Sequence, residues 1–162
     1  MESSSVSETD RKHLARCVEL AEQAVETGNR PFGSVLVSGD GRVLQEDYNR
    51  TGSGDPTRHP EFALARWAAE NLAPEERFSA TLYTSGEHCP MCATAHAWVG
   101  LGRIVFATST EDLVVWLDEF GAKPLPYKPI GTRELLPGHP IAGPDDTFRE
   151  AVKALHGRVH GG

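Results

Sequence analysis

The residue types best suited to chemistry lie in two short stretches, the His-Pro-Glu of residues 59–61 and the Cys-Pro-Met-Cys of residues 89–92. One imidazole and two thiols form the ligand set of an open zinc site, because three protein ligands on a tetrahedral ion leave the fourth position to water. A zinc-bound water loses its proton near neutral pH, since its pKa falls from about 15.7 to about 7. We therefore expect one Zn²⁺ per chain, held by His59, Cys89 and Cys92, with a bound water or hydroxide as the nucleophile.

A carboxylate stands beside this ligand set. Glu61 follows His59 by only two residues and cannot easily bind the same metal ion, so it is free to move protons. A carboxylate in that place can take a proton from water, pass it to a ring nitrogen and later protonate a leaving amine. These roles predict the hydrolytic removal of an amino group from a heteroaromatic ring, with release of ammonia.

Both stretches are expected at the start of a helix. Pro60 and Pro90 suit the first helical position, where the missing N–H would be unpaired in any case. The partial positive charge of a helix N-terminus favours the thiolate forms that bind metal. Because Cys89 and Cys92 are three residues apart, a first helical turn brings both sulfurs toward one point.

The hydrophobic pattern predicts the elements that position these stretches. We expect a first helix capped by Thr9 and running through Asn29, with Cys17 in the core, and a hairpin with strands at 34–37 and 42–44. The later elements are helices at 60–71, 90–101, 111–120 and 145–156 and strands at 81–84 and 103–108. Helices between strands imply right-handed crossovers and parallel pairing, which predicts an α/β domain of three layers.

Length and composition predict one domain. With 162 residues, of which 39% are apolar, the chain can bury one sizeable core, which we place at residues 10–156. Residues 1–9 are expected to be disordered and 157–162 to form a flexible tail. Residues 121–144 contain six prolines and four glycines, so we expect a long loop that acts as a lid or contacts a partner.

Charge and cysteine content exclude several classes of protein. The net charge of −7 gives no sign of a surface for phosphates, so nucleic acid is not an expected partner. No apolar run approaches the roughly 20 residues of a membrane span, and no export signal opens the chain. Three cysteines make a disulfide framework improbable. We expect a cytoplasmic protein without a membrane partner.

The two motifs together resemble the zinc-dependent cytidine deaminase superfamily, whose signature is His-x-Glu followed by Pro-Cys-x-x-Cys. The resemblance covers roughly residues 11–121. Four further segments are most similar to the bacterial guanine deaminases and their free-base relatives: Pro31 to Gly33, Asn49, Asp55 to Thr57 and Leu82 to Ser85. The resemblance to the superfamily implies a cytidine deaminase-like fold, in which helices flank a mixed five-stranded sheet. It also implies a homodimer.

The resemblance also implies roles for single residues. His59, Cys89 and Cys92 would hold zinc, and Glu61 would shuttle protons. The other implied roles are substrate binding through Asn49, Phe32 and Trp98, and a second proton-shuttling carboxylate from Asp118 or Glu119, of which we select Glu119.

Two positions depart from the family pattern and bear on the substrate. Pro60 replaces the usual alanine, whose amide donates to the substrate, and proline has no N–H to donate. A substrate oxygen left without that hydrogen bond costs about 1–3 kcal/mol. The prediction of guanine as the substrate is therefore weaker than the prediction of the reaction class. His88 stands where proline is common and puts a titratable ring beside a zinc ligand. We expect both residues to contribute to substrate binding.

Several readings remain open. The preferred one is a deaminase that acts on a free heterocyclic base and water, the base being guanine, cytosine or a related s-triazine. The alternative is a tRNA wobble-adenosine deaminase, which should carry basic and aromatic residues near its C-terminus. Less favoured are a non-catalytic zinc-stabilised domain, a closed structural zinc site that recruits His96, and a redox pair formed by Cys89 and Cys92.

Overall fold

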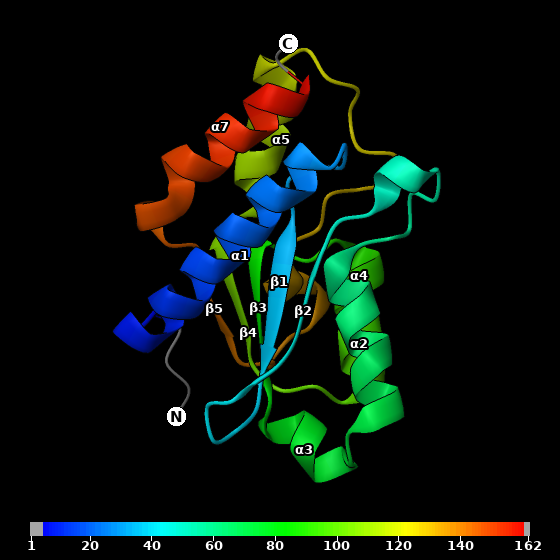
Figure 1. Cartoon of the computed structure of the whole chain (residues 1–162), viewed down its shortest axis with the longest axis vertical. Coiled ribbons are helices and arrows are strands. Elements are labelled where there is room, and N and C mark those ends of the chain that lie inside the picture. The colour runs from blue at the N-terminus through cyan, green and yellow to red at the C-terminus, as the bar shows by residue number, and fades with distance from the viewer. Residues whose placement is uncertain (1–4, 161–162) are drawn as a thin grey trace.

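The computed structural model describes residues 5–160. Helices and strands alternate through most of the chain (Figure 1). The elements in order are α1 (Glu8–Glu26), β1 (Gly33–Val37), β2 (Val43–Tyr48), the 3-10 turn η1 (Thr51–Ser53), α2 (Pro60–Asn71), α3 (Pro74–Ser79), β3 (Thr81–Gly86), α4 (Pro90–Val99), β4 (Ile104–Thr108), α5 (Thr110–Glu119), α6 (Thr132–Leu135), β5 (Ile141–Ala142), the 3-10 turn η2 (Asp146–Phe148) and α7 (Arg149–His160).

The five strands form one mixed sheet in the order β2-β1-β3-β4-β5. β1 is antiparallel to both of its neighbours, β2 and β3. β3, β4 and β5 are parallel to one another. The predicted α/β fold class, with its mixed five-stranded sheet, is confirmed.

Helices cover both faces of the sheet, so the domain has three layers. Alternate residues of the strands pack on opposite sides, as the two-residue period of a strand requires. Val35 and Tyr83 lie in the core on the side of α1, together with Cys17. Leu36 and Leu82 lie in the core on the other side, under α2 and α4. Figure 1 shows α1 and the α2/α4 pair on either side of the sheet.

The first helix begins earlier than the sequence indicated. Ser7, not Thr9, caps α1: its hydroxyl accepts a bond from the Asp10 amide at 3.1 Å, and the Asp10 carboxylate accepts one from the Ser7 amide at 2.9 Å. This reciprocal pair satisfies two amides that the first turn leaves free. The predicted disorder of residues 1–9 is therefore wrong for 5–9, and its first four residues lie outside the described residues. α1 ends at Glu26, three residues before the predicted end.

The second half of the chain is more regular than its composition suggested. Residues 121–144, predicted as a loop, contain α6 and the edge strand β5. β5 is recruited by backbone pairing with β4, which needs no side-chain pattern. The predicted tail from 157 is helical as far as His160, and residues 161–162 lie outside the described part. Gly157 lies in close contact with Phe120, which ties this end of α7 to the end of α5.

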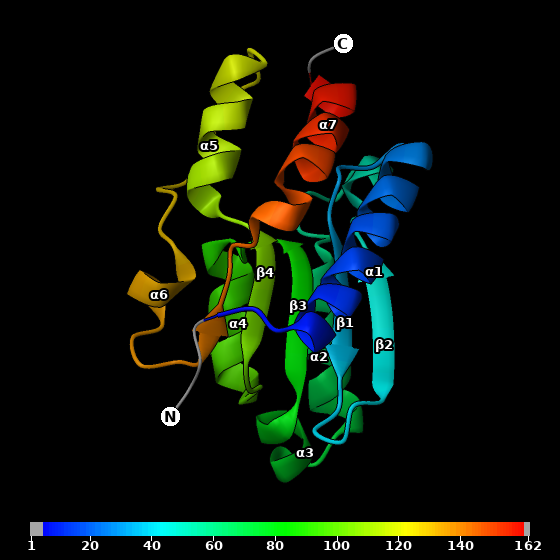
Figure 2. The same cartoon turned by 90° about the vertical axis from the view of Figure 1, so that its left-hand side faces the viewer.

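α5 and α7 project beyond the edge of the sheet where β3 and β4 end (Figure 2). The carboxyl ends of parallel strands are the usual place for ligands in open α/β sheets. Within residues 5–160, no helix has the length and apolar character needed to cross a membrane.

Candidate active site

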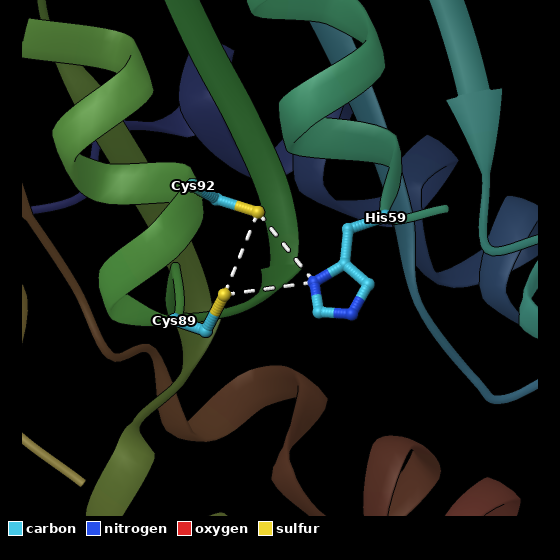
Figure 3. A group of neighbouring side chains, drawn as sticks. All are labelled: His59, Cys89 and Cys92. Carbon is cyan, nitrogen blue, oxygen red and sulfur yellow. Dashed lines mark hydrogen bonds between the residues drawn. The ribbon is translucent and has the colours of Figure 1, made fainter. Parts of the chain in front are cut away.

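The two predicted ligand stretches meet at one point, as Figure 3 shows. His59 is the residue before α2 and Cys89 the residue before α4, both with extended backbone, and a proline follows each as the first helical residue. Cys92 reaches in from the first turn of α4. Nδ1 of His59 lies 3.5 Å from each sulfur, and the two sulfurs are 3.6 Å apart.

These separations fit a tetrahedral zinc ion. Bonds of about 2.0–2.3 Å to nitrogen and sulfur at tetrahedral angles place the ligand atoms roughly 3.5–3.8 Å from one another. Within residues 5–160, the group of candidate metal ligands at this place contains His59, Cys89 and Cys92, and no fourth side chain joins it. Three protein ligands make this an open site, so His59, Cys89 and Cys92 are placed to hold one Zn²⁺.

The two thiols do not titrate alike. The hydrogen bond between the two sulfurs lowers the pKa of Cys89 and raises the pKa of Cys92, while burial opposes the first shift and adds to the second. A metal ion needs both sulfurs deprotonated, so binding must displace the thiol proton of Cys92.

Glu61 is a buried carboxylate in the first turn of α2, on the wall of the same cavity as the ligands. Its Oε1 atom is buried and has no hydrogen-bond partner among the described residues. Burial raises the pKa of Glu61 to about 7, with the charge on His59 opposing the shift. A carboxyl group of this kind can both accept and release a proton near neutral pH.

The cavity has a volume of about 670 Å³ and gathers most of the predicted site. Its wall includes His59, Glu61, Cys89, Asn49 and Phe32. These five residues come from four separate parts of the sequence, and the fold brings them to one cavity.

Asn49 presents a hydrogen-bond donor to this cavity. Its Oδ1 accepts bonds from the backbone amide and the hydroxyl of Thr51, at 3.0 and 2.7 Å, and from the Arg30 amide at 3.3 Å. These bonds fix the amide group with Nδ2 as the remaining donor. The side chain is buried, so it can donate to a ring atom of a bound molecule with little rearrangement.

Trp98 and Glu119, two predicted site residues, lie elsewhere. Trp98 is 90% exposed on α4, because six residues after Cys92 correspond to about 240° around a helix and turn the side chain away. Glu119 is paired with Lys153 of α7 at 3.0 Å, while Leu113 and Leu117 occupy the face of α5 toward the cavity. The structure therefore does not bring Trp98 or Glu119 to the cavity wall.

Pro60 and His88 are buried but are not part of the cavity wall. Pro60 sits in the first turn of α2 between His59 and Glu61, which both reach the cavity. His88 lies under α4, edge-on to His96 with ring centroids 5.4 Å apart, because neighbouring side chains in extended backbone point to opposite sides. Neither of these two predicted substrate contacts is brought to the cavity wall.

His96 does not close the metal site. Its Nε2 is 2.7 Å from the carbonyl oxygen of Gly102, and the ring packs against those of His88 and His139. The reading of a closed structural zinc site with His96 as fourth ligand is therefore wrong.

Several residues of the cavity wall were missed from sequence. They are Arg30, Glu87, Tyr127, His156 and His160. Only His156 carried a signal, since it follows the buried Val152 by four residues on the inner face of α7, but helical periodicity does not tell which element that face meets. Its ring is edge-on to Phe32 with centroids 5.3 Å apart, and its Nδ1 has no partner in the described part of the chain.

Comparison with known proteins matches residues 7–108 to the cytidine and deoxycytidylate deaminase zinc-binding region. A probable cytosine deaminase from Schizosaccharomyces pombe is 34% identical over 143 residues, 87% of this chain and 86% of that protein. The guanine deaminase of Bacillus subtilis is 39% identical over 101 residues, 61% of this chain and 64% of that protein. The tRNA-specific adenosine deaminase of Haemophilus influenzae is 36% identical over 104 residues, 64% of this chain and 60% of that protein. The chain thus spans under two thirds of the latter two.

The fold has a counterpart among solved structures. The guanine deaminase of Nitrosomonas europaea superposes with a TM-score of 0.69, covering 96% of this chain and 86% of that one. The identity of 19% limits this likeness to the fold. The mixed sheet flanked by helices is accordingly the cytidine deaminase-like fold.

Proposed function

The chain belongs to the cytidine and deoxycytidylate deaminase zinc-binding family of carbon–nitrogen hydrolases, and we propose that its substrate is a small aminated N-heterocycle. The substrate would be guanine, cytosine or a related s-triazine, with the ring amino group replaced by an oxo group and ammonia released. The observation that carries this proposal is the unpaired carboxylate oxygen of Glu61 in the cavity that His59 and Cys89 also line.

His59, Cys89 and Cys92 would hold the zinc ion, which when bound would supply a water molecule made acidic enough to act as a nucleophile near neutral pH. Glu61 would take one proton from the water as its oxygen bonds to the ring carbon that carries the amino group, and would deliver that proton to the adjacent ring nitrogen. Glu61 would then pass the remaining proton of the added hydroxyl group to the amine, so that the C–N bond breaks, ammonia leaves and the ring keeps the oxygen as an oxo group. Burial supports this role, because it brings the pKa of Glu61 to about 7.

The remaining wall positions the ring. Nδ2 of Asn49 donates a hydrogen bond to the substrate, and the ring of Phe32 provides an aromatic contact. His156 holds Phe32 from the other side through the edge-on contact and offers a neutral imidazole to the cavity, since burial lowers its pKa to about 3. An aminated heterocycle presents the donors and acceptors that these groups can pair.

A tRNA adenosine deaminase is the second candidate, because the relative from H. influenzae is as similar as the free-base enzymes. The charges on α7 favour the free base. Arg149 pairs with Asp112, Lys153 with Glu119 and Arg158 with Glu22, so these cations are already matched by carboxylates. Phosphate binding depends on cations that are free to neutralise the backbone.

We also propose that the protein is a cytoplasmic homodimer. Cys17, Cys89 and Cys92 are free thiols, as suits a reducing compartment. The 90% exposed Trp98 on α4 supports an interface on that helix. Light scattering during gel filtration should give twice the chain mass, and Trp98→Ser should shift the protein toward monomer. A wild-type monomer at micromolar concentration would contradict the dimer.

A substrate panel tests the activity. The zinc-loaded protein is incubated with guanine, cytosine, 2,4-diamino-1,3,5-triazine, and an anticodon stem-loop that carries a wobble adenosine. We expect ammonia from at least one free ring and no inosine in the stem-loop. Inosine formation without turnover of any free ring would replace the proposal by the second candidate.

A further inference from the structure

The cavity around the metal ligands is larger than one base ring requires. Its volume of about 670 Å³ falls in the range of roughly 300–1,000 Å³ that is typical of sites for drug-sized ligands. A ring held by Glu61 and Asn49 fills only part of that space. The deamination of an unsubstituted base leaves the rest without a role.

One part of the lining without an assigned role is apolar. It consists of Met91 on α4, Leu113 and Leu117 on α5, and Leu125 and Pro126 in the segment after α5, and we call these five residues the apolar wall. Leu113 and Leu125 are only half-buried and keep apolar surface open to the cavity. An apolar group placed there would remove this surface from water, whereas hydroxyl groups would lose hydrogen bonds to water without replacement.

The apolar wall and two of the metal ligands, His59 and Cys89, line the same cavity. Tyr127 directly follows the wall residue Pro126 and lines the same cavity. Because one cavity is lined both by this segment and by His59 and Glu61, a ring at the metal site can extend a substituent onto the wall.

We propose that the substrate is an aminated heterocycle that carries an uncharged apolar substituent, with the ring at the metal ligands and the substituent against the apolar wall. This inference rests on the proposed deamination and specifies the substrate class more narrowly. The substituent is attached away from the reacting amino group, because that amino group must face the metal site.

A matched series of substrates tests the inference. Cytosine, 1-butylcytosine and cytidine carry hydrogen, butyl or ribosyl on one ring nitrogen, and guanine, 9-butylguanine and guanosine repeat the series on a purine. For the ring that is turned over, we expect kcat/KM of the butyl compound to exceed that of the parent base by about tenfold or more, with no such gain for the riboside. Equal or lower values for the butyl compound, or a preference for the riboside, would overturn the inference while leaving deamination standing. A protein that turns over no compound of either series would overturn this inference, and one that also leaves 2,4-diamino-1,3,5-triazine unchanged would overturn the proposed deamination as well.

Variants of the wall locate the effect. Leu113→Asp places a charge on the wall and should reduce the ratio of butyl to parent kcat/KM toward one. Val115→Asp is the matched control, because Val115 is exposed about 200° around α5 from Leu113 and does not line the cavity. Leu125→Asn gives a second test in a segment with no regular structure, in case Leu113→Asp does not fold. An unchanged butyl preference in a folded wall variant would contradict the inference.

Discussion

The carboxylate of Glu87 is bound to Thr132, 45 residues later in the chain: its Oε2 accepts one hydrogen bond from the Thr132 amide at 2.6 Å and another from the hydroxyl at 2.8 Å. Its other oxygen accepts a bond from the Thr110 amide at 2.8 Å. One side chain thus anchors the start of α5 and the start of α6. The segment between these helices carries much of the cavity wall, including Tyr127.

Glu87→Ala should loosen this wall. Loss of the carboxylate leaves two backbone amides and a hydroxyl without their acceptor, and we expect the free energy of unfolding to fall by about 1–3 kcal/mol. KM should rise more than kcat falls, because the segment helps to bind the substrate. Urea unfolding and steady-state kinetics measure both effects. Glu111→Ala removes an exposed carboxylate from the first turn of α5; it is the control and should change neither value.

Asn49→Asp separates two roles of Asn49. An aspartate keeps the oxygen that accepts bonds from Thr51 and the Arg30 amide, but loses the donor that faces the cavity. We expect kcat/KM to fall about tenfold or more, with a small change in stability. Asn49→Ala should lose stability as well, by about 1–3 kcal/mol, since the loop amides lose their acceptor. Equal kinetics in the wild type and Asn49→Asp would exclude a substrate contact.

Asp10 makes stability depend on pH at the acid end. Burial raises the pKa of Asp10, but hydrogen bonds from Arg103, the Ser7 amide and Tyr83 outweigh it and bring the value to about 2, below the ordinary 3.8. A depressed pKa in the folded state adds stability above about pH 4, and this stability is lost as the pH falls toward 2. Asp10→Asn should therefore lower the free energy of unfolding by about 2 kcal/mol at pH 7. Denaturant titrations at pH 7 and pH 3 should show a smaller difference at pH 3. A difference independent of pH would contradict the assignment.

His156 should make the protein sensitive to mild acid. Burial lowers the pKa of His156 to about 3, below the ordinary 6.5, so the unfolded chain binds a proton that the folded chain does not. Stability is then full above about pH 6.5 and declines as the pH falls toward 3, by up to about 1.4 kcal/mol per unit. His156→Phe keeps an aromatic ring against Phe32 and Trp116 and should flatten this decline. Thermal unfolding from pH 7.5 to 4.5 measures the slope. The slope should stay steep in the control His13→Phe, which replaces a half-buried histidine outside the cavity, if His156 is the cause.

The sequence predicted the metal ligands because each motif is local. A proline at the first helical position places His59 and Cys89 just before their helices, and the spacing of three residues brings Cys92 to the same point. Element types were also predictable where the apolar pattern is strong, and α2 has its predicted bounds of Pro60–Asn71.

The sequence analysis misplaced or missed the residues and elements whose position depends on tertiary packing. Trp98 and Glu119 were assigned from family positions, and the rotation of α4 and α5 turns both side chains away from the cavity. His156 and Tyr127 were missed because they are far from the motifs in sequence and reach the cavity only through tertiary packing. β5 has only two residues and forms because it pairs with β4. A strand this short has no sequence pattern from which it could be predicted.

The most direct test of the account compares the wild type with Glu61→Gln at equal zinc content. Both proteins should bind one Zn²⁺ per chain, because the ligands are His59, Cys89 and Cys92, and both should fold. Ammonia release from the best free heterocycle should fall by about 10²–10⁴-fold in Glu61→Gln, since the amide cannot carry the proton. Wild-type activity in the zinc-loaded variant, or a wild-type protein that releases ammonia without zinc, would contradict the account.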